Sequence, residues 1–101
     1  MAMRAAPTEP STIEQAGTGT VVVTLPPYRL LLHNDEVNSM DHVVQVLLQS
    51  VPELAPEEAV AVMLEAHAEG VALVIVCPLE RAELYRDRLR GQGLTATIER
   101  G

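Results

Sequence analysis

Residues 28–39 carry the letters YRLLLHNDEVNS, an apolar run followed at once by a cluster of polar turn formers. The run over residues 28–33 predicts a strand, and Pro26 and Pro27 interrupt the apolar sequence just before it. Asn and Asp side chains bond to nearby backbone, so HNDEVNS predicts a loop. A strand that ends in a polar loop is therefore the starting point of the fold.

Two helices are predicted after this loop. Apolar residues recur at helical spacing over residues 40–50, with Asn38 or Ser39 placed to cap the start. A second helix is predicted from Pro56, whose ring suits a first helical position, to Gly70, which ends the last turn. The two helices are joined by a short connection, so we expect them to be neighbours.

The second half of the chain predicts two further strands and a third helix. VALVIVC, residues 71–77, is a continuous apolar run that predicts a central buried strand. An apolar stripe from Leu79 predicts a helix with Gly91 as its C-cap, and LTATIE, residues 94–99, alternates like a half-buried strand. The order strand, helix, helix, strand, helix, strand indicates an α+β domain, with three helices on one face of a three-stranded sheet.

The chain predicts one domain behind a tail. Its length of 101 residues suffices for a single hydrophobic core. The first part of the chain is rich in Ala, Pro, Thr and Gly and holds few large apolar groups, so burial cannot offset its ordering entropy. We expect a flexible N-terminal tail over residues 1–24 and a core domain over residues 25–101.

Composition excludes several classes of partner. The net charge is -7, with 14 acidic and 7 basic residues, and two Tyr are the only aromatic groups. Nucleic acid is therefore disfavoured, because its binding needs clustered positive charge and stacking surfaces. No stretch predicts a membrane span or a secretory signal. The single Cys77 cannot form an internal disulfide, so we expect a buried thiol and a reducing compartment, the cytoplasm.

The polar cluster HNDE, residues 33–36, is the most informative feature for function. Met63 and His67 are four residues apart, so they share one helix face, with Ala66 beside them. If that face and Met40 lie near the loop, a carboxylate, an amide and an imidazole adjoin flexible methionines. Such a site suits a ligand with a cationic head and an apolar body, and capture of a terminal amine is a known mode of peptide recognition.

Plainer interpretations of the same residues stay open. A polar turn can serve only to cap a helix, a lone His on an apolar face can be a hydrogen-bonded core residue, and methionines often fill cores. Metal binding is disfavoured because the candidate ligands lack the usual close spacing; they are His33, His42, His67 and Cys77. No serine has the glycines of a nucleophile elbow. We therefore expect no metal, no cofactor and no catalysis.

The segments YRLLLHNDE, MDHVVQVLL, VMLEAHAEG and GLTATIE, in this order, resemble the ClpS family of N-degron adaptors over residues 28–99. The VPEL insertion and the ending from AELY to GLT resemble the cyanobacterial and plastid branch most. The resemblance implies a non-enzymatic adaptor that recognises substrate proteins by an N-terminal Leu, Phe, Tyr or Trp. It also implies delivery to a Clp AAA+ ATPase of the ClpC or ClpA type.

The resemblance also implies roles for individual residues. The substrate's α-amino group would be bound by Asn34, Asp35 and His67. The apolar pocket for the first side chain would consist of Met40, Met63, Ala66 and Leu94. The pocket rim would consist of Glu36, Val37 and Asn38. Docking to the N-terminal domain of the ATPase would involve Glu80, Tyr85 and Arg86.

Several positions depart from the family pattern. Glu36 is one methylene longer than the usual Asp, and Asn38-Ser39 stand in place of Thr-Pro. Ala66 replaces a larger β-branched residue, which predicts a wider pocket with altered selectivity among bulky residues. Tyr85 stands where the docking pattern has a basic residue, so we expect altered docking contacts.

Two other functions remain open beside the adaptor. One is a Clp regulator that docks on the ATPase and changes its choice of substrates without binding N-degrons. The other is a small hydrolase that uses Asp35 and His67 as acid and base. Binding that requires a free N-terminal amine separates the adaptor from the regulator, and turnover lost in His67→Ala would identify the hydrolase.

Overall fold

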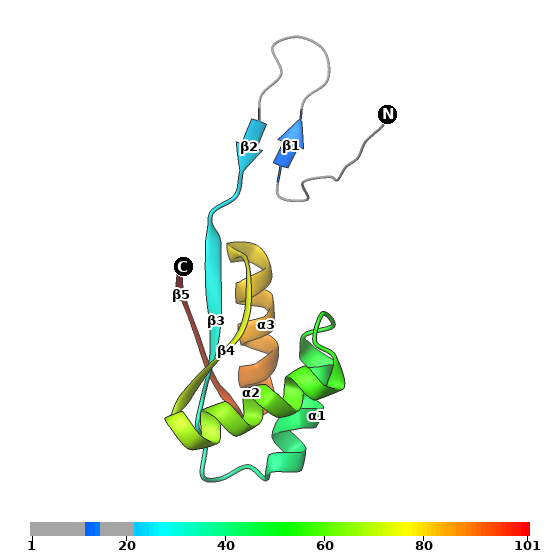
Figure 1. Cartoon of the computed structure of the whole chain (residues 1–101), viewed down its shortest axis with the longest axis vertical. Coiled ribbons are helices and arrows are strands. Elements are labelled where there is room, and N and C mark those ends of the chain that lie inside the picture. Colours follow the sequence, from blue (N-terminus) through cyan, green and yellow to red (C-terminus); the bar gives the residue numbers. More distant parts are fainter. Residues whose placement is uncertain (1–11, 15–21) are drawn as a thin grey trace.

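The computed structural model describes residues 12–14 and 22–101 of the chain. Three strands and three helices form the main body, and two short paired strands precede it (Figure 1). The elements are β1 Thr12–Glu14, β2 Val22–Thr24, β3 Pro27–His33, α1 Met40–Ser50, α2 Pro56–Glu69, β4 Val71–Pro78, α3 Leu79–Gly91 and β5 Thr95–Arg100. From β3 onward the predicted order is confirmed. Of the predicted tail, residues 1–11 and 15–21 lie outside the described residues.

β3 is the central strand of the body. β4 and β5 flank it, and both pair with it antiparallel. The prediction that residues 71–77 form a central strand is therefore wrong, because β4 lies at a sheet edge. Its alternate side chains are buried, while Val71, Leu73 and Val76 are 38%, 39% and 51% exposed. An apolar run cannot distinguish a strand covered on both faces from one whose second apolar face is open.

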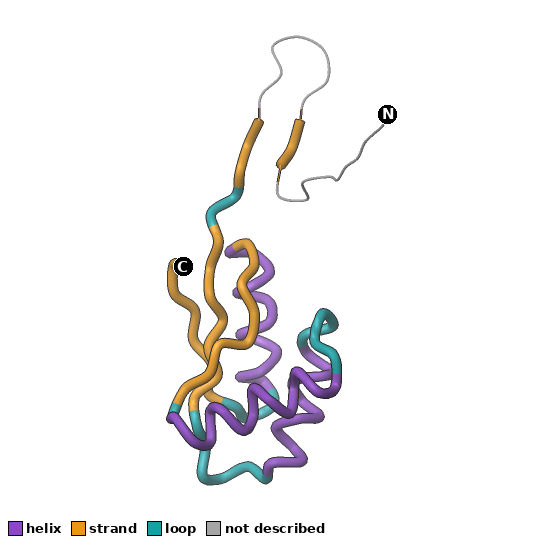
Figure 2. The backbone as a smooth tube through the Cα atoms, in the orientation of Figure 1, coloured by secondary structure: helices purple, strands orange, loops and turns teal. Residues whose placement is uncertain are grey.

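α2 and α3 pack on one face of this sheet, and α1 packs against these two helices (Figure 2). The core lies between the two layers and includes Leu30 of β3, Leu47 of α1 and Leu89 of α3, each with no exposed surface. The core aligns α1 and α2 beside each other, next to the end of β3. The polar loop after β3 is thereby brought close to both helices.

The starts of α1 and α2 are fixed by their own side chains. The Ser39 hydroxyl accepts a 3.1 Å hydrogen bond from the His42 amide, so Ser39 is the N-cap of α1 among the two predicted residues. At α2 the Glu58 carboxylate accepts a 2.7 Å bond from the Ala55 amide. α1 therefore begins directly after the polar loop.

Two glycines with left-handed backbone direct the chain back toward the loop. Gly70 ends α2 with φ of 91°, and its carbonyl accepts a 2.9 Å bond from the Asn34 amide. Gly93, with φ of 92°, makes the turn after α3, whereas the predicted cap Gly91 is still helical, so that prediction is wrong. The turn at Gly93 delivers Leu94 to the same region.

Candidate functional site

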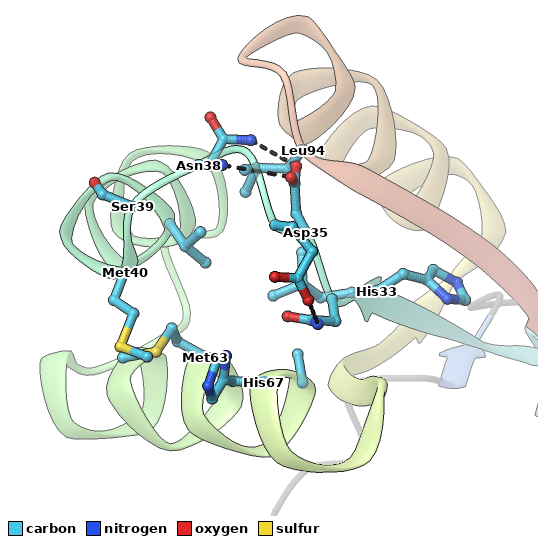
Figure 3. A pocket seen from close by; sticks show the side chains of 13 residues that line it. His33, Asp35, Asn38, Ser39, Met40, Met63, His67 and Leu94 are labelled. Carbon is cyan, nitrogen blue, oxygen red and sulfur yellow. Dashed lines mark hydrogen bonds between the residues drawn. The ribbon is translucent and has the colours of Figure 1, made fainter.

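A cavity of about 250 Å³ lies where the β3–α1 loop, α1, α2 and the segment before β5 meet (Figure 3). All residues predicted for the amine site, the pocket and its rim line it, with one exception. Val37 does not line the cavity, and its side chain is 90% exposed. The fold thus gathers residues from positions 34 to 94 at one place.

Three lining residues were not predicted for the site, and His33 was predicted only as part of the polar cluster. Leu32 and Val43 are core side chains that close the cavity from inside, and Ser39 is the helix cap. Leu32 and Val43 could have been found from strand alternation and from the helical spacing after Met40. His33 also borders the cavity, but its ring points away from it (Figure 3), and its Nε2 is 2.7 Å from Thr97 Oγ1.

The Asp35 carboxylate is fixed by hydrogen bonds from residues of its own loop. Its Oδ1 accepts bonds of 2.7 Å from the Val37 amide and 3.4 Å from the Asn38 amide. Its Oδ2 accepts a 2.6 Å bond from Asn38 Nδ2. The Val37 amide and then the Asn38 side chain lower the pKa of Asp35 below its usual value of 3.8, against a smaller opposing effect of desolvation. The cavity therefore has a fixed negative charge at neutral pH.

The neighbouring side chains complete the polar end of the cavity. Asn34 Nδ2 donates a 3.1 Å hydrogen bond to Glu36 Oε2, which leaves the Asn34 carbonyl oxygen as the acceptor on that side chain. His67 is exposed and its ring lies beside the cavity in Figure 3, without a hydrogen bond to any described residue. His67 is therefore not the hydrogen-bonded core histidine that the sequence had left open.

The other end of the cavity is apolar. Met63 and Ala66 of α2 are 9% and 3% exposed, and Leu94 is 4% exposed. Met40 is 45% exposed at the start of α1, and Figure 3 shows its thioether beside that of Met63. Methionine side chains adapt their shape to a ligand. The cavity thus combines a charged end with an adaptable apolar end.

The three predicted docking residues lie on α3 with different exposure. Glu80 is exposed in the first turn, and Arg86 is partly exposed, with its Nε 3.1 Å from Asp87 Oδ1. Tyr85 is only 4% exposed, and its hydroxyl donates a 2.7 Å hydrogen bond to Glu53 Oε1. The Tyr85 ring is part of the core, so it packs on the inner side of α3, opposite the exposed surface of this helix.

Glu53 comes from the VPEL segment between α1 and α2 and bridges two residues of α3. Its Oε2 is 3.1 Å from Arg81 Nη1, while its Oε1 accepts from Tyr85. Desolvation raises the pKa of Glu53, but hydrogen bonds from Tyr85 and from the Glu53 amide, together with the charge of Arg81, outweigh it and lower the pKa. Burial, and then the bond to Glu53, raise the pKa of Tyr85 to about 12. The bridge therefore joins an ionised carboxylate to a neutral phenol.

In residues 12–14 and 22–101, no three His, Cys, Asp or Glu side chains gather as metal ligands would. Cys77 is buried, and desolvation raises the pKa of its thiol, as expected for an unreactive cysteine. None of the described helices has the length and apolar character needed to cross a membrane.

Comparison with known proteins identifies relatives across most of the chain. The family model described as "ATP-dependent Clp protease adaptor protein ClpS" matches residues 23–97. The ClpS adapter of Synechococcus sp. (strain CC9902) is 57% identical over 74 residues, which are 73% of this chain and 71% of that protein. The chloroplastic adapter CLPS1 of Chlamydomonas reinhardtii is 46% identical over 94 residues, which are 91% of this chain and 58% of that protein.

A solved structure has the same fold. It is Agrobacterium tumefaciens ClpS2 bound to L-phenylalaninamide, with a TM-score of 0.65 and 27% identity over 75% of this chain and 98% of that chain. The family match includes every residue that lines the cavity. The chain therefore belongs to the ClpS family of ATP-dependent Clp protease adaptor proteins, in its cyanobacterial and plastid branch, and it is an adaptor, not an enzyme.

Proposed function

We propose that this adaptor binds substrate proteins by their first residue, when that residue is Leu, Phe, Tyr or Trp, and delivers them to a Clp AAA+ ATPase. The observation that carries the proposal is the pairing, in one cavity, of the fixed Asp35 carboxylate with an apolar wall. The Agrobacterium relative holds L-phenylalaninamide, a ligand that has both a free α-amine and a bulky apolar side chain.

The polar end would bind the α-ammonium group. This group has three N–H donors and a positive charge, and it would meet the Asn34 carbonyl oxygen, the Asp35 carboxylate and an unprotonated nitrogen of His67. Charge-assisted hydrogen bonds contribute about 1.5 to 3 kcal/mol each. An internal peptide bond has one uncharged N–H, so it cannot replace the ammonium group. Specificity for the first residue follows from this difference.

The apolar end would hold the first side chain. Burying a side chain of the size of Leu or Phe contributes about 1.5 to 3 kcal/mol. Met63, Ala66 and Leu94 form the enclosed part of the wall, and Met40 borders it at the surface. Together with two charge-assisted bonds, this burial supports roughly micromolar affinity after the costs of association.

Delivery requires a second surface. We place docking to the N-terminal domain of a ClpC- or ClpA-type ATPase on α3, with Glu80 and Arg86 as the exposed contacts and Tyr85 beneath them. This surface is separate from the cavity, since none of its residues lines it. Substrate and ATPase can then bind at once, in the cytoplasm or in the plastid stroma.

The deciding experiment compares one peptide in two forms. A fluorescent peptide that begins with Phe should bind in fluorescence anisotropy, and the same peptide acetylated at its N-terminus should not, because acetylation removes the positive charge and two N–H donors. A peptide that begins with Gly controls for the first side chain. If neither form binds while the N-terminal domain of the ATPase still does, the protein is a regulator instead.

Ala66→Val should change the selectivity of the pocket. Ala66 is 3% exposed in the wall, so two added methyl groups would narrow the space for the first side chain. We expect Trp-initiated peptides to weaken by about tenfold relative to Leu-initiated ones, because overpacking costs about 1 to 3 kcal/mol. The matched control is Ala68→Val, at an exposed position of the same helix. Equal ratios of affinity for Leu, Phe and Trp peptides in Ala66→Val and wild type would contradict the proposed wall.

A further inference from the structure

The side chain of Asn38 joins two distant segments of the chain at the cavity. Its Nδ2 donates a 2.6 Å hydrogen bond to Asp35 Oδ2 and a 3.0 Å hydrogen bond to the Gly93 carbonyl oxygen. A side-chain amide nitrogen has two hydrogens, so both are used. Figure 3 shows Asn38 on the edge of the cavity, with its amide directed toward the Asp35 carboxylate, which lies beside Leu94. Asn38 is thus a bridge between the β3–α1 loop and the turn before β5.

This bridge determines which part of the Asp35 carboxylate can meet a ligand. Oδ1 already accepts two backbone amides of the loop, and Oδ2 accepts Asn38. A carboxylate has about four acceptor positions, so about one remains, on Oδ2. The bond from Asn38 fixes the direction of that remaining position. The orientation of a charged partner decides how much of its interaction a ligand gains.

The same bridge holds the apolar wall in place. Gly93 directly precedes Leu94, which is 4% exposed and lines the cavity. A second contact lies beside the first, with His42 Nε2 3.1 Å from the Gln92 carbonyl oxygen. Since a carbonyl oxygen only accepts, this nitrogen must carry the hydrogen. Two successive carbonyl groups of the turn are therefore bound from the loop and from α1.

We infer that Asn38 is a positioning residue that orients the Asp35 carboxylate toward the ligand's ammonium group and couples it to the wall residue Leu94 through the Gly93 carbonyl. The inference rests on the proposed binding of N-terminal residues. It differs from a contact at the rim, because the amide nitrogen of Asn38 is fully used inside the protein. Asn38 therefore acts on the ligand through Asp35.

Two variants separate positioning from other roles of Asn38. Asn38→Leu keeps the size of the side chain and removes both hydrogen bonds, so a Phe-initiated peptide should bind about tenfold more weakly. Asn38→Asp keeps the shape and adds a negative charge. If only negative potential mattered, Asn38→Asp would bind the ammonium more tightly. The Asn38→Asp variant places a second carboxylate next to Asp35, where wild type has a donor. We therefore expect this variant to bind the peptide at least as weakly as Asn38→Leu.

Two further variants serve as controls. Asn38→Thr replaces the two amide hydrogens with one hydroxyl hydrogen, which can bond to Asp35 or to Gly93 but not to both. The affinity of this variant should therefore lie between those of wild type and Asn38→Leu. This variant also keeps the test valid if Asn38→Asp does not fold. Gln45→Leu also replaces an amide side chain with Leu, but at an exposed position of α1, and this variant should bind the peptide like wild type. Thermal unfolding of every variant separates lost affinity from lost structure.

The dependence of peptide affinity on pH is a readout that a purely structural role of Asn38 would not change. Removing the Asn38 bond should raise the pKa of Asp35 toward its usual value, so the affinity of Asn38→Leu should begin to fall at a higher pH than that of wild type. The other titratable groups near Asp35 are Glu36, His42 and His67, and they are the same in both proteins, so a difference between the two pH profiles reports on Asn38.

The same shift can be followed without a ligand, by NMR titration of the Asp35 carboxyl group. If wild type does not bind the free-amine peptide, the proposed function fails, and the NMR titration still tests the bond from Asn38 to Asp35. The inference is overturned if Asn38→Leu binds like Gln45→Leu with an unchanged pH profile, or if Asn38→Asp binds more tightly than wild type.

Discussion

Asp35→Ala should reduce the affinity for a Phe-initiated peptide by about ten- to a hundredfold, since it removes the charge-assisted hydrogen bond from the ammonium group to the remaining acceptor position of this carboxylate. The variant removes the negative charge that would face the ammonium group. It also removes the acceptor for the Val37 amide and for the Asn38 side chain, so the loop loses its internal order. Isothermal titration calorimetry with the free-amine peptide measures the loss.

The matched control is Asp41→Ala, which removes the same charge from an exposed position at the start of α1. It should bind the peptide like wild type, because Asp41 does not line the cavity. Asp35→Asn is a stricter test, because it keeps the shape of the side chain but turns an N–H₂ group toward donors whose hydrogen bonds Asp35 accepts. Equal affinity of Asp35→Ala and Asp41→Ala would show that Asp35 does not bind the ligand.

The low pKa of Asp35 sets the direction of the pH dependence. The Val37 amide and the Asn38 side chain hold the pKa below 3.8 in the folded protein. The carboxylate therefore stays ionised as the pH falls through the usual Asp range, and its contribution to binding is lost only below that range. The same sign holds for folding, where its contribution is present above the unfolded pKa and lost as pH falls through the folded one.

The local features of the fold could be predicted from the sequence, but the strand order could not. Capping residues and helical spacing are local signals, and they placed α1 and α2 at their observed positions. The place of β4 depends on which strand pairs with which, and its apolar letters fit an edge and a centre equally well. Val71 and Leu73 are apolar on the open face, where polar residues would have revealed a strand covered on one face only.

The candidate site was predictable where residues share one helix face or one loop. Helical spacing predicts that Met63, Ala66 and His67 share one face. Only the family resemblance predicts that this face lies near Asp35, as the cavity shows. The bond from Asn38 to Gly93 joins positions 55 residues apart, and no local pattern marks it. Polar contacts of this kind depend on the packing of whole elements, so the sequence predicted Asn38 as a possible helix cap, and the family resemblance predicted it as a rim residue.

A feature shared with the cyanobacterial and plastid branch and a departure from the family pattern meet in one hydrogen bond. The VPEL insertion contains Glu53, and the unusual docking residue is Tyr85, whose hydroxyl donates to that carboxylate. A buried phenol needs an acceptor, and the inserted segment supplies it. The same carboxylate bonds Arg81 on the outer side of α3. The insertion therefore holds the proposed docking helix from the side of the α1–α2 connection.

Glu53→Ala should lower the free energy of unfolding by about 2 kcal/mol, because it leaves the buried Tyr85 hydroxyl without its acceptor. The ion pair with Arg81 adds little, since its side chains are 38% and 50% exposed. Tyr85→Phe should cost less, because it removes the donor as well as its need for an acceptor. In urea unfolding, the double variant should therefore be more stable than the sum of the single losses predicts.

The destabilisation of Glu53→Ala should depend on pH. The pKa of Glu53 is lowered in the folded protein, so its ionised form contributes stability above the unfolded pKa, near 4.5, and loses that contribution as pH falls through the folded value. The gap in stability between wild type and Glu53→Ala should thus be full at neutral pH and shrink in acid. Glu83→Ala, at an exposed position of α3, should show neither the loss nor its pH dependence.

Binding assays on Glu53→Ala would separate the two surfaces of the adaptor. Glu53 does not line the cavity, so the affinity for the Phe-initiated peptide should equal that of wild type below the unfolding transition. The affinity for the N-terminal domain of the ATPase should fall, because α3 loses its attachment to the α1–α2 connection. Loss of peptide affinity with intact ATPase binding would reverse this assignment and would place the Glu53 bridge in support of the cavity instead.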